Sequence, residues 1–226
     1  ATAADRAYHR AMAKRRSAVA VRDDAGDSKS ERTRARILDA AAHVLSVKGF
    51  AGTRLTDVAE HAELQAPAIY YYFPSRENLI EEVMLCGISE MRADLQAVLA
   101  DLPPETGSMD KIMIAIETQL RHELELSDYT TASIRNSGQL PEHLRARQKR
   151  EETAYGRIWQ GLFADAVADG EVRGDLDPRI ARMLVMGALN WAAEWWDSRR
   201  DSVDLIVQNA QALVRTGLTA DTTRKK

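Results

Sequence analysis

Hydrophobic residues recur at helical spacing along most of the chain, and glycine, proline and capping residues separate the repeats. A first helix is predicted from about Ser30, and its apolar face and glycine stop consist of Ile37, Leu38, Ala41, Val44, Leu45 and Gly49. Thr53 is suited to cap a second, short helix that ends near His61. Gln65 begins a third helix that ends near Tyr71. The pattern therefore predicts a cluster of three helices.

The same spacing continues through the rest of the chain. Ser75, with Asn78 three residues later, begins a long amphipathic helix that runs to about Ala100. Prolines and a glycine at 103–107 interrupt the pattern, which then predicts helices at about 108–126, 128–137, 141–169, 178–198 and 202–217. No segment alternates as a strand does, and no internal repeat is present. The prediction is an all-α protein, a three-helix domain followed by a larger helical body.

Residues 53–79 have the spacing of a helix-turn-helix, with two short helices separated by a turn of about three residues. The second helix carries Gln65 and three consecutive tyrosines, Tyr70, Tyr71 and Tyr72. These side chains suit a DNA groove better than a core, because their polar ends can meet phosphates and base edges. The segment therefore predicts a DNA-reading helix.

This stretch resembles the DNA-binding domain of the TetR family of bacterial transcriptional repressors. The resemblance covers about residues 30–80, and it is carried by Arg-Ile-Leu-Asp-Ala-Ala at 36–41, Lys48-Gly49-Phe50, Thr53, Asp57-Val58-Ala59, Ile69-Tyr70-Tyr71-Tyr72-Phe73 and Ser75-Arg76-Glu77-Asn78-Leu79. It implies an amino-terminal helix-turn-helix domain and a carboxyl-terminal domain that binds a ligand and dimerises. The combination of motifs is far more specific than any one of them.

Two positions depart from the family pattern. Glu63 stands in the turn where glycine is usual, and a side chain there costs roughly 1–2 kcal/mol if the backbone must adopt positive φ. Arg76 stands where lysine is usual, and arginine also binds phosphate, often through two hydrogen bonds.

The resemblance implies two groups of DNA contacts. Phosphate and sugar contacts that position the protein are expected from Thr53, Arg54, Tyr70, Tyr71 and Arg76. Base contacts are expected from Thr56, Gln65, Ala66 and Pro67. Gln65 has the best geometry, because its amide can pair with adenine. Among the neighbours, Val58, Ala59, Leu64, Ile69 and Phe73 are expected in the core, whereas Tyr72 suits either the core or the phosphate surface.

Composition limits the compartment and the broad class. Of 226 residues, 45% are hydrophobic and 29% charged, as in ordinary globular proteins. The net charge is only −3, but residues 1–80 carry 13 Lys and Arg against 10 Asp and Glu, whereas the remainder carries 18 against 24. A basic end favours an anionic partner there. The single cysteine, Cys86, fits a reducing cytoplasm, and the absence of a long apolar run or a signal peptide predicts no membrane partner. The family resemblance implies that this cytoplasm is bacterial.

The charge and linker pattern also suggests domain boundaries. Residues 1–28 alternate alanine with arginine and lysine and end in a polar linker, which predicts a flexible amino-terminal arm. The arm either tracks DNA phosphates or reaches a minor groove, or it is a disordered tail without a role. We expect a DNA-binding domain at 29–74, a ligand-binding and dimerisation domain at 75–218, and a tail at 219–226.

The last two helices predict a homodimer. Residues 180–196 are apolar around most of the helix circumference, so that helix must be covered on several sides. The final helix has one apolar face, and an isologous four-helix contact between two copies would cover both. The alternative is a monomer that buries both helices internally.

Candidate effector contacts fall into two groups in the body. Large rings suited to an apolar ligand are Trp159, Trp191 and Trp195, and polar candidates on a short helix are Tyr129, Arg135 and Asn136. Core or dimer packing is the alternative role for the tryptophans. The stretch 187–196 further resembles a TetR subgroup that answers to acyl-coenzyme A thioesters, which implies that the basic run Arg145, Arg147, Lys149 and Arg150 meets coenzyme phosphates; the alternative is a solvated helix face.

Other classes of function find little support. The chain has no phosphate-binding glycine loop, nucleophile elbow or zinc-protease motif, and its histidines are scattered, so no enzyme, cofactor or metal site is expected. The alternative to a regulator is a helical interaction module that has lost DNA binding. We predict a homodimeric repressor that a small hydrophobic or acyl-CoA-like effector releases from a palindromic double-stranded operator.

Overall fold

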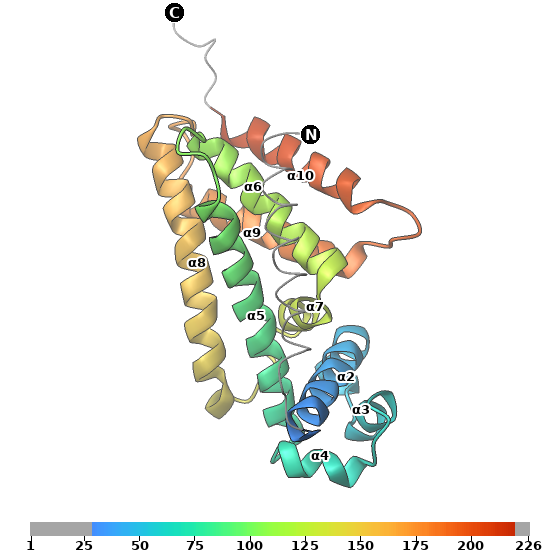
Figure 1. Ribbon diagram of the computed structural model, residues 1–226. Coiled ribbons are helices and arrows are strands. Elements are labelled where there is room, and N and C mark those ends of the chain that lie inside the picture. The colour runs from blue at the N-terminus through green and yellow to red at the C-terminus, as the bar shows by residue number, and fades with distance from the viewer. Residues whose placement is uncertain (1–28, 220–226) are drawn as a thin grey trace, which may run out of the picture.

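The protein's structure, a computed structural model, describes residues 29–219, and these are almost entirely helical (Figure 1). Within that range the only strand-like pairing is a single bridge between Val172 and Thr219. The predicted all-α class is confirmed. The predicted arm at 1–28 lies outside the described residues, as does the predicted tail from 220 onward.

The amino-terminal domain consists of α2 (Lys29–Gly52), α3 (Leu55–His61) and α4 (Ala66–Tyr72), at the lower end of the molecule in Figure 1. One buried cluster joins the three helices, and it includes Ile37, Leu45, Val58, Ile69 and Phe73. The expected core positions Val58, Ala59, Ile69 and Phe73 are buried, and Leu64 is partly buried against them.

Helix α2 bends at Gly49, whose backbone has φ 68° and ψ 177°. Glycine adopts this left-handed conformation without the penalty of a Cβ atom. The regular part of the helix therefore ends at the predicted position, and a short turn continues to Gly52.

Helix α5 (Arg76–Ala100) connects the two parts of the molecule (Figure 1). Ser75 caps it as predicted, because its Oγ accepts a hydrogen bond from the backbone N–H of Asn78 at 3.1 Å. Leu79, Ile80, Val83 and Met84 belong to the amino-terminal cluster, whereas Ile88, Met91 and Leu95 belong to the cluster of the body. One continuous helix thus contributes to both cores.

The body contains α6 (Ser108–Arg121), η1 (His122–Leu126), α7 (Asp128–Arg135), η2 (Glu142–Leu144), α8 (Arg145–Ala168), α9 (Pro178–Trp195) and α10 (Val203–Leu218). Helices α5, α6 and α8 lie side by side, and the core between them includes Ile112, Ile116, Trp159 and Phe163. The predicted helical segments are confirmed, but the five-residue π-helix η1 was not anticipated.

Helices α9 and α10 bury few residues within one chain. The large apolar side chains left exposed on them are Ile180, Met183, Leu184, Trp191, Trp195, Leu205 and Leu213. No helix among the described residues is long and apolar enough to cross a membrane.

Candidate nucleic-acid interface and ligand site

Helix α4 turns one face to the core and the other to solvent. Ile69 is fully buried and anchors the helix, whereas Tyr70 and Tyr71 are 58% and 82% exposed. Gln65, at the N-cap position, and Pro67 are exposed as well. Two neighbouring tyrosines exposed on one short helix offer apolar rings with polar ends, which are enriched at binding interfaces, so the outer face of α4 is a candidate binding surface.

Tyr72 belongs to the opposite side of this helix. Its ring makes an edge contact with Tyr71, with ring centroids 5.1 Å apart, and it packs against the amino-terminal core. The sequence left Tyr72 either to the core or to the phosphate surface, and the structure shows it packed against the core.

The turn between α3 and α4 contains Glu63 at φ 53°. It is the only residue other than glycine with positive φ between positions 29 and 219. The expected left-handed turn is therefore present despite the glutamate. Its side chain is exposed, and its carboxylate lies 3.9 Å from the guanidinium of Arg36. An ion pair this long and this exposed to solvent offsets little of the backbone strain at Glu63.

The expected cap at Thr53 is wrong. Arg54 occupies the N-cap position of α3, and the Thr53 side chain is buried with its hydroxyl donating to the carbonyl of Gly49 at 2.8 Å. That carbonyl also accepts a hydrogen bond from the backbone N–H of Thr53 at 3.1 Å, so the N–H and the hydroxyl of one residue both bond to the carbonyl at the bend. Thr53 therefore closes the turn after α2 and does not present its hydroxyl to DNA.

Arg76 also makes internal contacts where a phosphate contact was expected. Its Nε donates to the carbonyl of Thr53 at 2.6 Å, and a second guanidinium nitrogen donates to the carbonyl of Phe50. The guanidinium lies 4.7 Å from the centre of the Phe50 ring and pairs with Glu77 at 3.1 Å. Arg76 thus links the start of α5 to the end of α2. It contributes to the candidate binding surface of α4 indirectly, by fixing the positions of these two helix ends.

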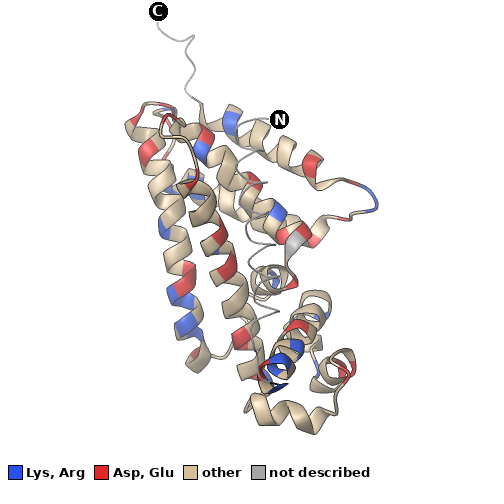
Figure 2. Ribbon diagram, viewed as in Figure 1, with Lys and Arg blue, Asp and Glu red and all other residues tan. Residues whose placement is uncertain are grey.

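The remaining expected contacts lie beside α4. Arg54 and Thr56 are exposed on α3, and Ala66 is half-buried. Lys48 is bound to Asp57 at 2.8 Å, which lowers the pKa of the Asp57 carboxyl. Figure 2 shows an uncharged α4 with basic residues on the neighbouring α2. An uncharged reading helix flanked by cations suits a groove between phosphate strands.

Comparison with known proteins agrees with this geometry. Residues 37–83 match the family model for bacterial regulatory proteins of the tetR family, and residues 105–218, half of the chain, match the tetracyclin repressor-like, C-terminal domain. The chain belongs to the TetR family. It is a DNA-binding transcriptional regulator with a helix-turn-helix domain.

Individual relatives are distant but cover most of the chain. The fatty acid metabolism regulator protein of Bacillus subtilis is 22% identical over 79% of this chain and 90% of its own. The repressor KstR2 of Rhodococcus jostii is 21% identical over 87% of this chain and 95% of its own. The crystal structure of AibR with isovaleryl coenzyme A and operator DNA has a TM-score of 0.72 at 16% identity, covering 80% of this chain and 97% of that one.

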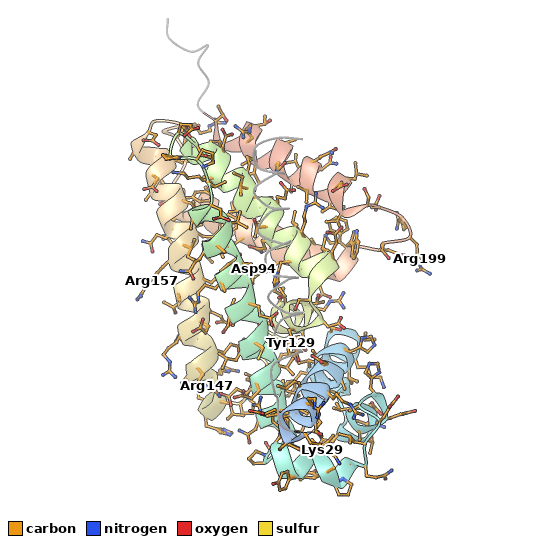
Figure 3. All side chains as sticks on the ribbon, in the orientation of Figure 1. Lys29, Asp94, Tyr129, Arg147, Arg157 and Arg199 are labelled. Carbon is orange, nitrogen blue, oxygen red and sulfur yellow. The ribbon has the colours of Figure 1, made fainter. Side chains whose placement is uncertain are left out.

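The residues of α7 expected to meet an effector contact α2 instead. Figure 3 shows Tyr129 at this junction, and its hydroxyl donates to Asp39 of α2 at 2.7 Å. Burial, followed by the hydrogen bond to the Asp39 carboxylate, raises the pKa of Tyr129. The phenol is therefore neutral and bound to the DNA-binding domain.

Arg135 and Asn136 complete the bend in α2. Arg135 donates to the carbonyl of Ser46 at 2.8 Å, and the buried Asn136 accepts from the backbone N–H of Phe50 at 2.7 Å. In an uninterrupted helix the carbonyl of residue 46 and the N–H of residue 50 would bond to each other. Two consecutive residues of the body thus provide partners on both sides of the kink at Gly49.

The three tryptophans do not converge. Trp159 is fully buried in the body core, whereas Trp191 and Trp195 are largely exposed on α9. Large apolar rings suit a pocket, a core or a dimer contact alike, and α9 leaves the rings of Trp191 and Trp195 exposed. The expectation of one pocket lined by all three is wrong.

Among the cavities formed by residues 29–219, three lie away from the expected effector residues. The first, about 460 Å³, lies between α2, α3 and the start of α7 and includes His43, His61 and Asp128. The second, about 620 Å³, lies between α6 and α10 and includes Met113, Gln211 and Arg215. The third, about 660 Å³, lies between α8 and α9. None of the six expected effector residues lines these three.

The basic run at the start of α8 is only partly available. Arg145 donates to the carbonyls of Leu140 and Gly138, and Arg147 pairs with Glu82 at 2.5 Å (Figure 3 labels Arg147). Lys149 and Arg150 are exposed. Over residues 29–219, no group of three or more His, Cys, Asp or Glu side chains is arranged to hold a metal ion.

Proposed function

We propose that this TetR-family chain is a homodimeric repressor that a small effector releases from a palindromic operator. The observation that carries the proposal is the outward face of α4, where Gln65, Tyr70 and Tyr71 project into solvent from a helix fixed by the buried Ile69. Gln65 reads a base, and the two tyrosines bind the sugar-phosphate edge. Arg54 and Thr56 extend the contact along α3.

The exposed apolar side chains of α9 and α10 support the dimer. Positions 180, 184, 191 and 195 follow one another at helical spacing, so they form a continuous stripe on α9. A second copy would cover this stripe together with Leu205 and Leu213 of α10. Two reading helices in such a dimer would meet half-sites about 34–36 Å apart, one turn of DNA.

A thioester is the effector class that we propose. AibR, which shares the fold, is named in complex with isovaleryl coenzyme A, and a similar regulator is named for fatty acid metabolism. The exposed Lys149 and Arg150 would be available to coenzyme phosphates, whereas Arg145 and Arg147 are already bound within the chain.

The decisive experiment measures binding to DNA from upstream of the protein's own gene over a range of salt concentrations. We expect affinity to fall steeply with salt, because Lys and Arg contacts displace counterions from phosphates. Tyr71→Ala should weaken binding without changing the melting temperature, and Val47→Ala, at an exposed position outside α4, is the matched control. A salt slope near zero would favour an interaction module without DNA binding.

The effector class needs its own measurement. Isovaleryl coenzyme A and a longer acyl thioester should bind to the purified protein in calorimetry and raise the operator dissociation constant. Because coupling is reciprocal, operator DNA should weaken thioester binding by the same factor. Binding without any change in operator affinity would exclude these thioesters as effectors.

A further inference from the structure

The π-helix η1 places a buried carboxyl group in the body. Glu123 is 2% exposed, and its Oε1 accepts a hydrogen bond from the backbone N–H of Ala193 in α9 at 3.2 Å. Its other oxygen, Oε2, is buried without a hydrogen-bond partner in the described structure. π-helical turns occur frequently at functional sites, and a buried polar atom without a partner is a site where a ligand group gains a hydrogen bond.

The surroundings of Glu123 favour its neutral form. Burial raises the pKa of this carboxyl well above its usual range, and the N–H of Ala193 and the guanidinium of Arg135 only partly oppose that effect. The like charge of Glu194 also raises the pKa of Glu123. On the facing helix α8, the Tyr155 phenol lies close enough to interact electrostatically with Glu123. The free oxygen is therefore a neutral hydrogen-bonding group.

Arg135 joins this region to the DNA-binding domain. One guanidinium nitrogen donates to the carbonyl of Ser46 in α2 at 2.8 Å, and the other donates to the carbonyl of Ala193. Its Nε lies 3.4 Å from the carboxylate of Glu194. The peptide groups of Ala193 are thus held on the N–H side by Glu123 and on the carbonyl side by Arg135.

We propose that Glu123 receives a polar group of the effector and that Arg135 passes the resulting change from Ala193 to α2. This inference rests on the proposed effector-regulated repression and adds the receiving group and the route. A ligand that draws the Glu123 carboxyl away from Ala193 releases the last turn of α9, and the carbonyl that Arg135 holds moves with it. Ser46 lies three residues before the bend at Gly49, on the helix against which α3 and α4 pack.

The chemistry of this region also selects the ligand. A neutral ester, thioester, amide or hydroxyl group can bond to the free oxygen of Glu123. A carboxylate or phosphate would add a second anion beside Glu194, whose carboxylate already faces Arg135, and both terminal nitrogens of that guanidinium already donate to carbonyls. We therefore assign a neutral polar group to the end of the effector that enters the body.

The first test compares two arginines of the body. Arg135→Met should speed backbone hydrogen exchange at residues 46–53 by about tenfold and alter operator affinity, because α2 loses its tie to α9. Arg92→Met is the matched control: its side chain is 29% exposed against 31% for Arg135, and it is paired with Glu151 at 2.8 Å, but neither residue belongs to α2. Unchanged exchange in Arg135→Met, or equal changes in both variants, would overturn the route.

The second test is a double-mutant cycle that needs no effector. Glu123→Ala should change exchange at residues 46–53 in the wild-type background and have no such effect in the Arg135→Met background. Glu123→Gln keeps an acceptor for the Ala193 N–H and should behave as wild type, which guards against loss of folding in the alanine variant. Equal effects of Glu123→Ala in both backgrounds would show that the two residues act independently, and the relay would be rejected.

The third test uses isovaleryl coenzyme A and free isovalerate as probes. The thioester should bind about tenfold or more weakly to Glu123→Ala than to wild type, and it should bind to Arg135→Met without changing operator affinity. Tighter binding of isovalerate than of the thioester would overturn the assignment of a neutral group. If neither probe binds to wild type, the thioester part of the proposed function fails, and the double-mutant cycle still decides the relay.

Discussion

Asn136 accepts a hydrogen bond from the backbone N–H of Phe50 across the junction between the body and α2, with 2.7 Å between Oδ1 and N. The same side chain donates to the carbonyl of Ala132 at 2.8 Å, so the amide is oriented from both ends. Its position is therefore fixed by α7, and it in turn fixes the turn that follows Gly49. Together with the hydrogen bond from Tyr129 to Asp39, this contact holds α2 against the body.

Asn136→Ala should destabilise the protein by about 1–3 kcal/mol, because the N–H of Phe50 loses its acceptor in a partly buried place. Denaturant unfolding measures the effect. Thr153→Ala is the control, since Thr153 donates to the carbonyl of Lys149 on an exposed face of α8 and should change stability by less than about 0.5 kcal/mol. Similar losses in both variants would show that the Asn136 contact has no special role.

Gln65→Ala should cost about 1–3 kcal/mol of discrimination at one operator base pair and leave stability unchanged. The reason is that Gln65 is exposed and its side chain makes no capping hydrogen bond to α4. Competition binding with operators substituted at single positions measures the loss. An equal loss on every sequence would instead indicate that Gln65 binds the sugar-phosphate backbone.

Glu63→Gly should stabilise the amino-terminal domain by about 0.5–1 kcal/mol, because glycine adopts φ 53° without the Cβ clash. Glu60→Gly is the matched control: Glu60 is exposed within α3, and glycine there should destabilise by about 1 kcal/mol. Thermal unfolding of the two variants should therefore shift in opposite directions. A loss of stability in Glu63→Gly would mean that its side chain makes a favourable contact in the turn.

Local signals in the sequence were sufficient for the helices and the special turn. Ser75 caps α5 through a residue three positions away, and the conformations of Gly49 and Glu63 follow from the short motifs around them. The hydrogen bonds that join the end of α7 to α2 are not local, because Asn136 and Arg135 bond to Phe50 and Ser46, which lie 86 and 89 residues earlier in the chain. Residue type and spacing cannot specify such a pairing.

The same limit explains the errors at the interface and in the body. A long guanidinium such as that of Arg76 reaches either a phosphate or two nearby carbonyls, and the fold places the carbonyls of Thr53 and Phe50 within reach. An apolar stripe such as that of Trp191 and Trp195 has the same sequence pattern whether it packs in the core of one chain or is covered by a second copy. Glu123 stands among Arg121, His122 and Glu125 in the sequence, and periodicity does not distinguish its buried carboxyl from the exposed one of Glu125.

Leu184→Glu should convert a dimer to a monomer, because Leu184 lies at 69% exposure within the apolar stripe of α9 and a charge there would be buried by a second copy. Light scattering or analytical ultracentrifugation measures the mass. Val47→Glu introduces the same charge at a 66% exposed position on α2 and should leave the mass unchanged. A dimer that persists in Leu184→Glu would place the interface elsewhere.

Glu123 should make stability fall as pH rises. Its pKa is raised in the folded state, so between the unfolded value of about 4.3 and the higher folded value the folded chain keeps a proton that the unfolded chain has lost. Folding then takes up a proton, and each rise in pH across that window favours unfolding. The groups that face the carboxyl, Arg135, Glu194 and Tyr155, remain in place in a Glu123→Gln variant.

Melting temperature measured from pH 5 to pH 8 should therefore decline more steeply in wild type than in Glu123→Gln, which has no proton to lose. Glu142→Gln is the control, since the Glu142 side chain is 95% exposed, and its curve should follow that of wild type. Parallel curves for wild type and Glu123→Gln would mean that the carboxyl titrates alike in both states. That result would also remove the argument for a neutral receiving group in the body, because an ionised Glu123 would attract a cationic ligand instead.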